Sequence, residues 1–291
     1  MRNVLTGNLG IDTFYKVPEI DIIGEYLPIT LEMVLVGLVG AIILALVTGT
    51  IAAANKDSKI DGTIKATYLI TWSTPGYLIA FALQLVFAYK LKLLPAGGLA
   101  NPLLSSAPYP NVTHALALFP RPIEIFLTEL TTFFIGFPII RSLIDSDWVY
   151  FSSLIHHMVL PSLTLALIAF GSLARIVRAS TVEALDKDYI RLAYMKGLSK
   201  RQVVYGTAFR NAVIPVITII ALMFGFAVAG AVIIEYVFNY YGMGYFLVQA
   251  IYNLDYIAIL ATTLLIGISV ILFNTIADIL YGVVDPRVRT A

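Results

Sequence analysis

Long apolar runs alternate with short charged connections along most of the chain. Five runs reach or approach the roughly 20 apolar residues that a helix needs to cross a bilayer core. They are Ile29–Ala54, Ala66–Tyr89, Trp148–Ala174, Ala212–Ile234 and Ile257–Ala277. Pro75-Gly76 within the second run predicts a kink, which membrane helices tolerate. A sixth run, Leu130–Ile140, is too short to span, and we interpret it as interfacial or re-entrant.

The composition indicates that lipid surrounds most of this surface. Hydrophobic residues make up 59% of the 291 residues and charged residues only 13%, against about 25% charged in a soluble domain. The net charge of +1 gives no basic field for nucleic acid. The absence of cysteine excludes disulfides, Cys-based metal centres and thiol nucleophiles. We therefore expect an all-α, polytopic membrane helix bundle with five transmembrane helices.

The placement of lysine and arginine predicts the orientation of these helices. Connections of one set carry 13 of these residues and those of the opposite set carry 6. The richer set is also the shorter, so the positive-inside rule places the C-terminus in the cytoplasm and the N-terminus outside. The richer set is 55–65, 175–211 and 285–291, and the poorer set is 1–28, 90–147 and 235–256.

The resulting domain plan has one transmembrane domain, residues 29–284, between an external segment 1–28 and a cytoplasmic tail 285–291. A long external loop, 90–154, contains an N-glycosylation sequon at Asn111. A cytoplasmic segment, 179–211, joins the third and fourth spans. The spans themselves are set at about 29–54, 66–89, 155–178, 212–236 and 257–284.

The cytoplasmic segment predicts two short amphipathic helices joined at Gly197. Lys196 suits the last turn of the first helix, Gly197 the left-handed position after it, and Ser199 with Gln202 a capping box. The elbow presents Ala193, Gly197, Leu198 and Ser199, so another protein could approach it closely, or the helices could lie on anionic lipid. An apolar stripe is expected from Val182, Leu185, Tyr189, Leu192 and Ala193.

The segment 188–216, DYIRLAYMKGLSKRQVVYGTAFRNAVIPV, resembles the EAA loop of ABC-transporter permeases, in the variant typical of the dipeptide/oligopeptide permease family. This resemblance implies the type I ABC importer permease fold. Members usually have six spans, so it also implies that the helix expected before Gly7 is missing from this chain. Further segments resemble the family in family order, namely 7–10, 27–33, 160–167, 229–251, 254–257 and 273–289.

In that family the EAA loop is a coupling helix that docks into a separate ATPase. Ala193 and Gly197 keep the alanine and glycine of the motif, whereas Arg191 and Leu192 replace its Glu and first Ala. Phe209-Arg210 stands where Leu-Pro is usual. The coupling residues implied by the resemblance are Tyr189, Ala193, Lys196, Gly197, Leu198 and Ser199.

The resemblance also implies the partners and the solute class. The partners are a homologous second permease, two cytoplasmic ATP-binding subunits and an external solute-binding protein, assembled in the plasma membrane without nucleic acid. The solute is a peptide or a related small solute, with oligosaccharides and nickel as alternatives. No phosphate-binding loop occurs in the chain, so ATP must be bound by a partner.

Polar residues inside the apolar runs are the other functional candidates. Gln84 and Asn274 could line a pathway or form interhelical hydrogen bonds. Tyr241 lies within the aromatic, glycine-containing stretch 239–256, and Glu235 lies just before it. This stretch is interpreted either as an external gate or as an aromatic belt. For Glu235, pairing with a helix end or with another helix is favoured over contact with the solute.

Enzymatic chemistry has little support in the sequence. His156 and His157 are adjacent, so on a helix they point about 100° apart and cannot easily share a metal ion. We expect no catalytic residues, cofactor or metal site, and no enzymatic activity. The alternative functions are an ATP-independent secondary transporter or channel, and a membrane-embedded enzyme. The lack of mid-span acidic residues counts against ion coupling, and no His, Asp and Glu residues converge.

Overall fold

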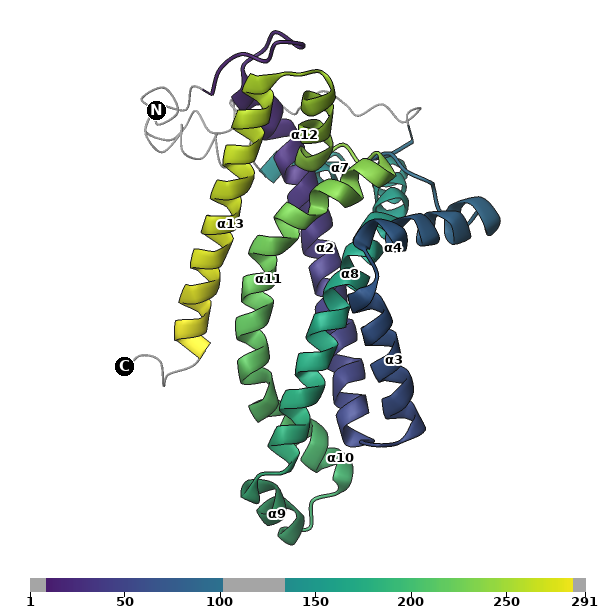
Figure 1. Ribbon diagram of the computed structural model, residues 1–291, viewed down its shortest axis with the longest axis vertical. Coiled ribbons are helices and arrows are strands. Elements are labelled where there is room, and N and C mark those ends of the chain that lie inside the picture. Colours follow the sequence, from purple (N-terminus) through teal and green to yellow (C-terminus); the bar gives the residue numbers. More distant parts are fainter. Residues whose placement is uncertain (1–8, 102–133, 285–291) are drawn as a thin grey trace. The chain divides into compact units, whose positions relative to one another are not determined.

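The computed structural model describes residues 9–101 and 134–284, and these residues fold into helices and connections (Figure 1). They contain no strand, only an isolated antiparallel bridge between Ile11 and Pro18. The predicted all-α class is therefore confirmed. The elements are α2 (Glu19–Ala54), α3 (Lys59–Ser73), α4 (Gly76–Leu83), the π-helical η1 (Gln84–Lys90), α7 (Pro138–Ile144), α8 (Trp148–Leu185), α9 (Asp188–Met195), α10 (Lys200–Gln202), the π-helical η2 (Val203–Ala208), α11 (Phe209–Phe238), α12 (Met243–Tyr252) and α13 (Tyr256–Val284).

Among the residues that the structure describes, three helical segments are individually long and apolar enough to cross a membrane: Glu19–Ala54, Trp148–Leu185 and Tyr256–Ile276. The number rises to as many as six if each sharply bent pair of helices counts as one span. The predicted five spans lie within this range. α2 begins ten residues before the predicted first span, and Glu19 and Asp21 in its first turn complement the positive end of the helix dipole.

The predicted kink at Pro75-Gly76 is present and is a sharp break. The helices Lys59–Ser73 and Gly76–Lys90 meet at 109°, so the predicted second span is not one continuous helix. Proline disfavours the helical conformation at the residue before it, and Thr74 is accordingly extended, with φ −87° and ψ 127°. A second bend of 50° separates Lys200–Val213 from Pro215–Gly225.

The chain forms two compact units, and the long helices contribute residues to both. The first unit comprises Met1–Met33, Ala80–Pro161 and Ala231–Ile266. Its apolar clusters include Ile22 packed with Phe246, and Ile23 packed with Met243. The rings of Tyr26 and Phe246 stack with centroids 5.2 Å apart. These contacts hold the start of α2 against α12.

The second unit comprises Val34–Ile79, Ser162–Gly230 and Gly267–Ala291. Within it α2 packs closely on α8 through glycines. A Cβ on Gly37 would lie 2.6 Å from Leu165, and one on Gly49 would lie 2.8 Å from Val177. Small residues that let helix backbones approach are typical of helix packing in lipid.

Large apolar side chains stay exposed on the long helices. Leu260, Ile271 and Ile279 of α13 are 72%, 67% and 62% exposed, and exposed apolar surface that goes beyond scattered single residues marks contact with a protein or a membrane. Such a surface suits contact with lipid or with another membrane subunit. The Asn111 sequon and the tail 285–291 lie outside the described residues, as do the first four residues of the predicted interfacial run Leu130–Ile140.

Candidate coupling site

The first helix of the predicted coupling segment, α9, ends as the sequence indicates. Gly197 has φ +79°, a conformation that glycine adopts without steric cost. The amide of Leu198 donates to the carbonyl of Ala193 at 3.3 Å, and that of Gly197 to Tyr194 at 2.9 Å. These two bonds form a Schellman motif, which satisfies carbonyls at the helix end.

The next helix starts with the predicted capping box. The amide of Ser199 donates to Oε1 of Gln202 at 2.9 Å, and the amide of Gln202 donates to Oγ of Ser199 at 3.4 Å. Each side chain thus satisfies a backbone amide that the helix leaves unpaired. With a defined end on one helix and a defined start on the next, the turn Lys196–Ser199 is held in one geometry.

The helices α9 and α10 and the turn between them form a helical hairpin. The residues buried on its inner side differ from the predicted apolar stripe. Ile190 and Ala193 of α9 pack in a cluster with Ala184, Val203, Ala208 and Ala212, and Leu185 lies against it. Tyr189 and Leu192, which the stripe would have buried, are exposed. The predicted stripe is therefore correct for Leu185 and Ala193. It fails for Tyr189 and Leu192 because α8 ends at Leu185 and the chain turns at Asp186-Lys187, which changes the face that α9 presents.

The outer side of the hairpin carries an exposed apolar surface, which we name the α9 surface. Met195 is 79% exposed and Leu192 51%. Together they stand on a helix of eight residues whose other side is firmly packed. The α9 surface consists of Tyr189, Leu192, Tyr194, Met195 and Leu198.

The predicted coupling residues therefore fall into two groups. Tyr189, Lys196, Gly197, Leu198 and Ser199 are exposed, whereas Ala193 is only 5% exposed. Ala193 thus fixes the hairpin from within and is not presented at its elbow as the sequence suggested. An exposed ion pair, Lys187 to Glu183 at 2.9 Å, borders the hairpin, and its hydrogen bond raises the pKa of Lys187.

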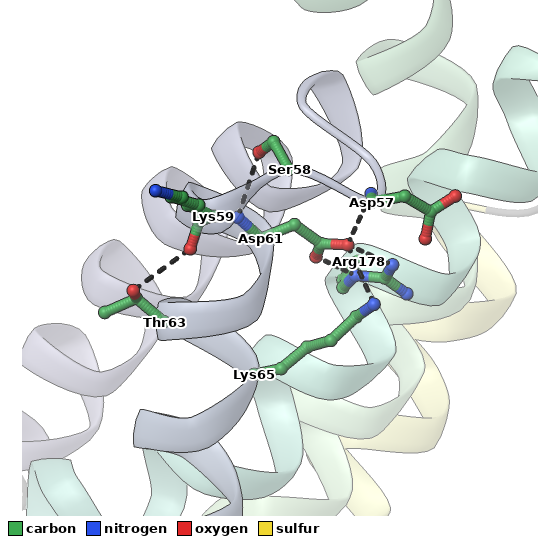
Figure 2. Close-up of polar contacts among 7 residues, drawn as sticks. All are labelled: Asp57, Ser58, Lys59, Asp61, Thr63, Lys65 and Arg178. Carbon is green, nitrogen blue, oxygen red and sulfur yellow. Dashed lines mark hydrogen bonds and ion pairs between the residues drawn. The ribbon is translucent and has the colours of Figure 1, made fainter.

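A network around Asp61 joins the start of α3 to α8 (Figure 2). The Asp61 side chain is fully buried. Arg178 reaches it with two bonds, Nε to Oδ1 at 2.6 Å and Nη2 to Oδ2 at 2.8 Å. Lys65 adds a contact at 2.8 Å and the amide of Asp57 one at 2.9 Å. The carboxylate is therefore compensated in charge and saturated in hydrogen bonds.

This network supports the base of the hairpin. Arg178 lies in the last two turns of α8, which lead directly into the packed cluster of Ala184 and Ile190. Ser58 caps α3 by accepting from the amide of Asp61 at 3.3 Å. In the sequence, Arg178 and Lys65 are recognisable only as positive charges of the predicted cytoplasmic connections. Asp61 four residues before Lys65 was a visible helix-pair signal, but the distant partner Arg178 was not.

The predicted pathway residues Gln84 and Asn274 belong to separate units. Nε2 of Gln84 donates to the carbonyl of Ala96 at 2.6 Å. Oδ1 of Asn274 is buried without a hydrogen-bond partner among the described residues. A Cβ on Gly225 would collide with that oxygen, so glycine there makes room for the amide.

Glu235 lies in the last two turns of α11, and its fully buried side chain reaches the start of α12. Its Oε2 accepts from the amides of Gly244 and Tyr245 at 2.7 and 3.0 Å. Nearby, Oγ1 of Thr30 accepts from the amide of Met243 at 2.8 Å. Together they cap the first turn of α12, where a carboxylate is favourable. Tyr241, the other predicted gate residue, is 45% exposed and packs edge-on against Tyr245.

The two adjacent histidines each contact their own helix. Nδ1 of His156 lies 2.8 Å from the carbonyl of Ser152, and Nδ1 of His157 lies 2.7 Å from that of Ser153. The rings are thus engaged separately, each with the residue one turn earlier.

The several apolar helices of the described residues are those of a multi-pass membrane protein. The pattern of the binding-protein-dependent transport system inner membrane component family matches residues 45–290. The chain belongs to this family.

Individual relatives extend the similarity over nearly the whole chain. A dipeptide transport system permease of Alkalihalophilus pseudofirmus is 31% identical over 99% of this chain and 79% of its own length. The dipeptide transport system permease of Escherichia coli K12 is 30% identical over 98% of this chain and 78% of its own length. An oligopeptide transport system permease of Bacillus subtilis is 30% identical over 99% and 78%. The predicted dipeptide/oligopeptide permease resemblance is confirmed.

Proposed function

We propose that this chain is the permease subunit of an ATP-driven importer and forms a translocation pathway for peptides. The observation that carries the coupling role is the α9 surface. Apolar side chains such as Met195 and Leu192 stand exposed on a hairpin whose backbone geometry is fixed at both sides of its turn. Rigid, apolar and small, this surface suits insertion into a groove of another protein.

The partners in this proposal are a homologous second permease, two ATP-binding subunits and an external binding protein. The family and the transport names of the relatives support such an assembly. Peptides are the proposed solute because the relatives are named for dipeptides and oligopeptides. The chain itself is proposed to carry out no bond chemistry, since energy comes from ATP bound by the partner.

The proposed mechanism couples ATP binding to helix movement. Closure of the ATPase dimer moves the α9 surface, and the packed cluster around Ala193 transmits that displacement to α8 and α11. The bidentate contact of Arg178 with Asp61 carries it further to α3. Hydrolysis and release then reset the bundle. A segment that transmits force must be rigid. The Schellman motif that ends α9, the capping box at Ser199 and the buried cluster around Ala193 provide that rigidity.

The proposed orientation places the hairpin and the C-terminus in the cytoplasm, as the distribution of lysine and arginine indicates. Gln84 and Asn274 are the proposed pathway residues. Tyr241 is the proposed contact residue of an outer gate, and Glu235 holds that gate in place by capping α12.

The chain has no cysteine, so one introduced thiol is a unique attachment point. Met195→Cys and Leu192→Cys place it on the α9 surface without disturbing Gly197, whose positive φ makes substitution there strained. Each variant, labelled with a thiol-linked photo-crosslinker, is assembled with the ATPase subunits and second permease in nanodiscs. We expect crosslinks to the ATPase whose yield changes between ATP and ADP.

Lys187→Cys is the matched control, because Lys187 is exposed at the hairpin but lies before α9. It should give weak crosslinks that nucleotide does not alter. The coupling role would be contradicted if Met195→Cys and Leu192→Cys failed to crosslink in inserted protein. Quenching of a fluorophore at Met195→Cys by brominated lipids would then favour helices that lie on lipid.

A further inference from the structure

Residues 10–19 form a tight hairpin before α2. The amide of Asp12 donates to the carbonyl of Val17 at 2.9 Å, and the amide of Glu19 donates to that of Gly10 at 3.1 Å. Glu19 is the first residue of α2. Asp255 stands immediately before α13, in the same compact unit. The fold thereby brings Asp255 close to Asp12 and Glu19, which lie more than 200 residues earlier in the sequence.

Oxygens of Asp12, Glu19 and Asp255 all lie within 4.8 Å of one another, and all three residues are buried. Asp255 Oδ2 accepts from the amide of Thr13 at 2.6 Å. Its Oδ1 accepts from the amides of Ile257 and Ala258, each at 3.1 Å. Asp12 Oδ1 accepts from the amide of Phe14 at 2.8 Å and from that of Tyr15. These bonds fix two of the three carboxylates in place.

Glu19 differs from the other two acids, because its carboxylate accepts no hydrogen bond from the described residues. The residue is 0% exposed, and both carboxylate oxygens are buried without a hydrogen-bond partner among the described residues. None of the ion pairs formed by those residues includes any of the three acids. A buried carboxylate without a partner is strongly unfavourable, and two further carboxylates beside it add repulsion.

We propose that Asp12, Glu19 and Asp255 bind a hard divalent cation, calcium, which ties the hairpin 10–19 to the start of α13. The ligand set contains only oxygen, and calcium and magnesium prefer such ligands. Calcium tolerates irregular geometry and six to eight ligands, so carboxylates from a loop and two helix starts can be completed by carbonyl or water oxygens. The site has no role in peptide coupling and does not depend on it.

The test uses the complete permease complex in nanodiscs, with calcium as the probe. Lys16 is exposed at the tip of the hairpin, so trypsin cleavage after it, detected as a new N-terminus at Val17, reports how firmly the hairpin is held. We expect calcium, titrated from a chelated start, to slow this cleavage at least about fivefold with saturation, because a ligand that binds only the closed hairpin stabilises it. Magnesium and sodium are the comparison ions.

Glu19→Gln removes one ligand charge while keeping the shape of the side chain. We expect it to weaken the calcium effect at least about tenfold in concentration. Glu25→Gln is the matched control, since Glu25 is an exposed glutamate on the same helix, and it should respond like the unaltered chain. Asp255→Asn is less informative because it also disturbs the cap of α13.

Two results would overturn the proposal. If calcium has no effect on the unaltered complex, while Glu19→Gln is as well protected as the starting protein, Glu19 holds a proton and no cation is bound. If calcium protects Glu19→Gln as well as Glu25→Gln, its action is a general one on lipid or partners. Protection by magnesium at lower concentration than calcium would reassign the ion and reject calcium.

Discussion

Asp61 and Glu19 are two buried carboxylates at helix starts, in different units of the molecule, with opposite surroundings. Asp61 receives two bonds from Arg178, one contact from Lys65 and one backbone amide. Glu19 receives no hydrogen bond from the described residues and faces two more carboxylates. Burial is equal at the two positions, so the difference lies entirely in what the chain supplies as counter-charge.

Asp61 thus belongs to a complete ion pair, whereas Glu19 lies in a group of acids that has no positively charged partner among the described residues. Where the chain provides the cation, the carboxylate holds two helices together and requires nothing from solution. Where it provides only acids, the compensating charge must come from a proton or a bound cation. Neutralising the carboxylate should therefore lower stability only in the region of Asp61, and only the region of Glu19 should respond to calcium.

The largest effect is expected from Arg178→Leu. It leaves the fully buried Asp61 with Lys65 as its remaining cation, so the free energy of unfolding should fall by about 3–5 kcal/mol. The measurement is the thermal denaturation of the purified protein in nanodiscs, together with the yield of inserted protein.

The double variant Asp61→Leu/Arg178→Leu tests whether this loss comes from the uncompensated charge. It removes the carboxylate along with the guanidinium, so it should be more stable than Arg178→Leu alone. If the two variants are equally unstable, the loss reflects packing of the Arg178 side chain and not the buried charge of Asp61.

Neutralising the carboxylate should lower the free energy of unfolding at Asp61 but not at Glu19. Asp61→Asn should lower the free energy of unfolding by about 2 kcal/mol, since charge-assisted bonds become neutral ones. Glu19→Gln, measured with a chelator present, should leave stability unchanged or raise it by about 1 kcal/mol, because repulsion with Asp12 and Asp255 is relieved. A loss in both variants would show that Glu19 has a partner of its own, and the contrast between the regions would fail.

Much of the fold follows from the apolar runs, because span length is dictated by the bilayer. The break at Pro75, the turn at Gly197 and the capping box of Ser199 and Gln202 were predictable, since each depends on residues within one helical turn. Which residues of α9 are buried was not predictable. It depends on where α8 stops, and the two-residue turn at Asp186-Lys187 has no proline or glycine to mark it.

Long-range polar contacts were the least predictable part. Arg178 and Asp61 are 117 positions apart, and the acidic cluster joins the start of the described chain to Asp255. Glu235 illustrates the same difficulty. The sequence identified it as an unusual acid near a span end, but only the structure shows that its carboxylate caps α12. Charge at membrane depth signals a role without revealing the partner.

The smallest effect is expected from Lys65→Gln. Lys65 contacts Asp61 at 2.8 Å along the same helix, but its side chain is 34% exposed, so solvent screens the pair. Asp61 would keep both bonds from Arg178, and the loss in the free energy of unfolding should be about 0.5 kcal/mol. Lys59→Gln is the matched control, as Lys59 is an exposed lysine in the first turn of α3 and forms no ion pair within the described residues. Thermal denaturation at low and high salt measures both. If Lys65→Gln matched Arg178→Leu in its effect, total positive charge around Asp61 would matter more than the bidentate geometry of the guanidinium.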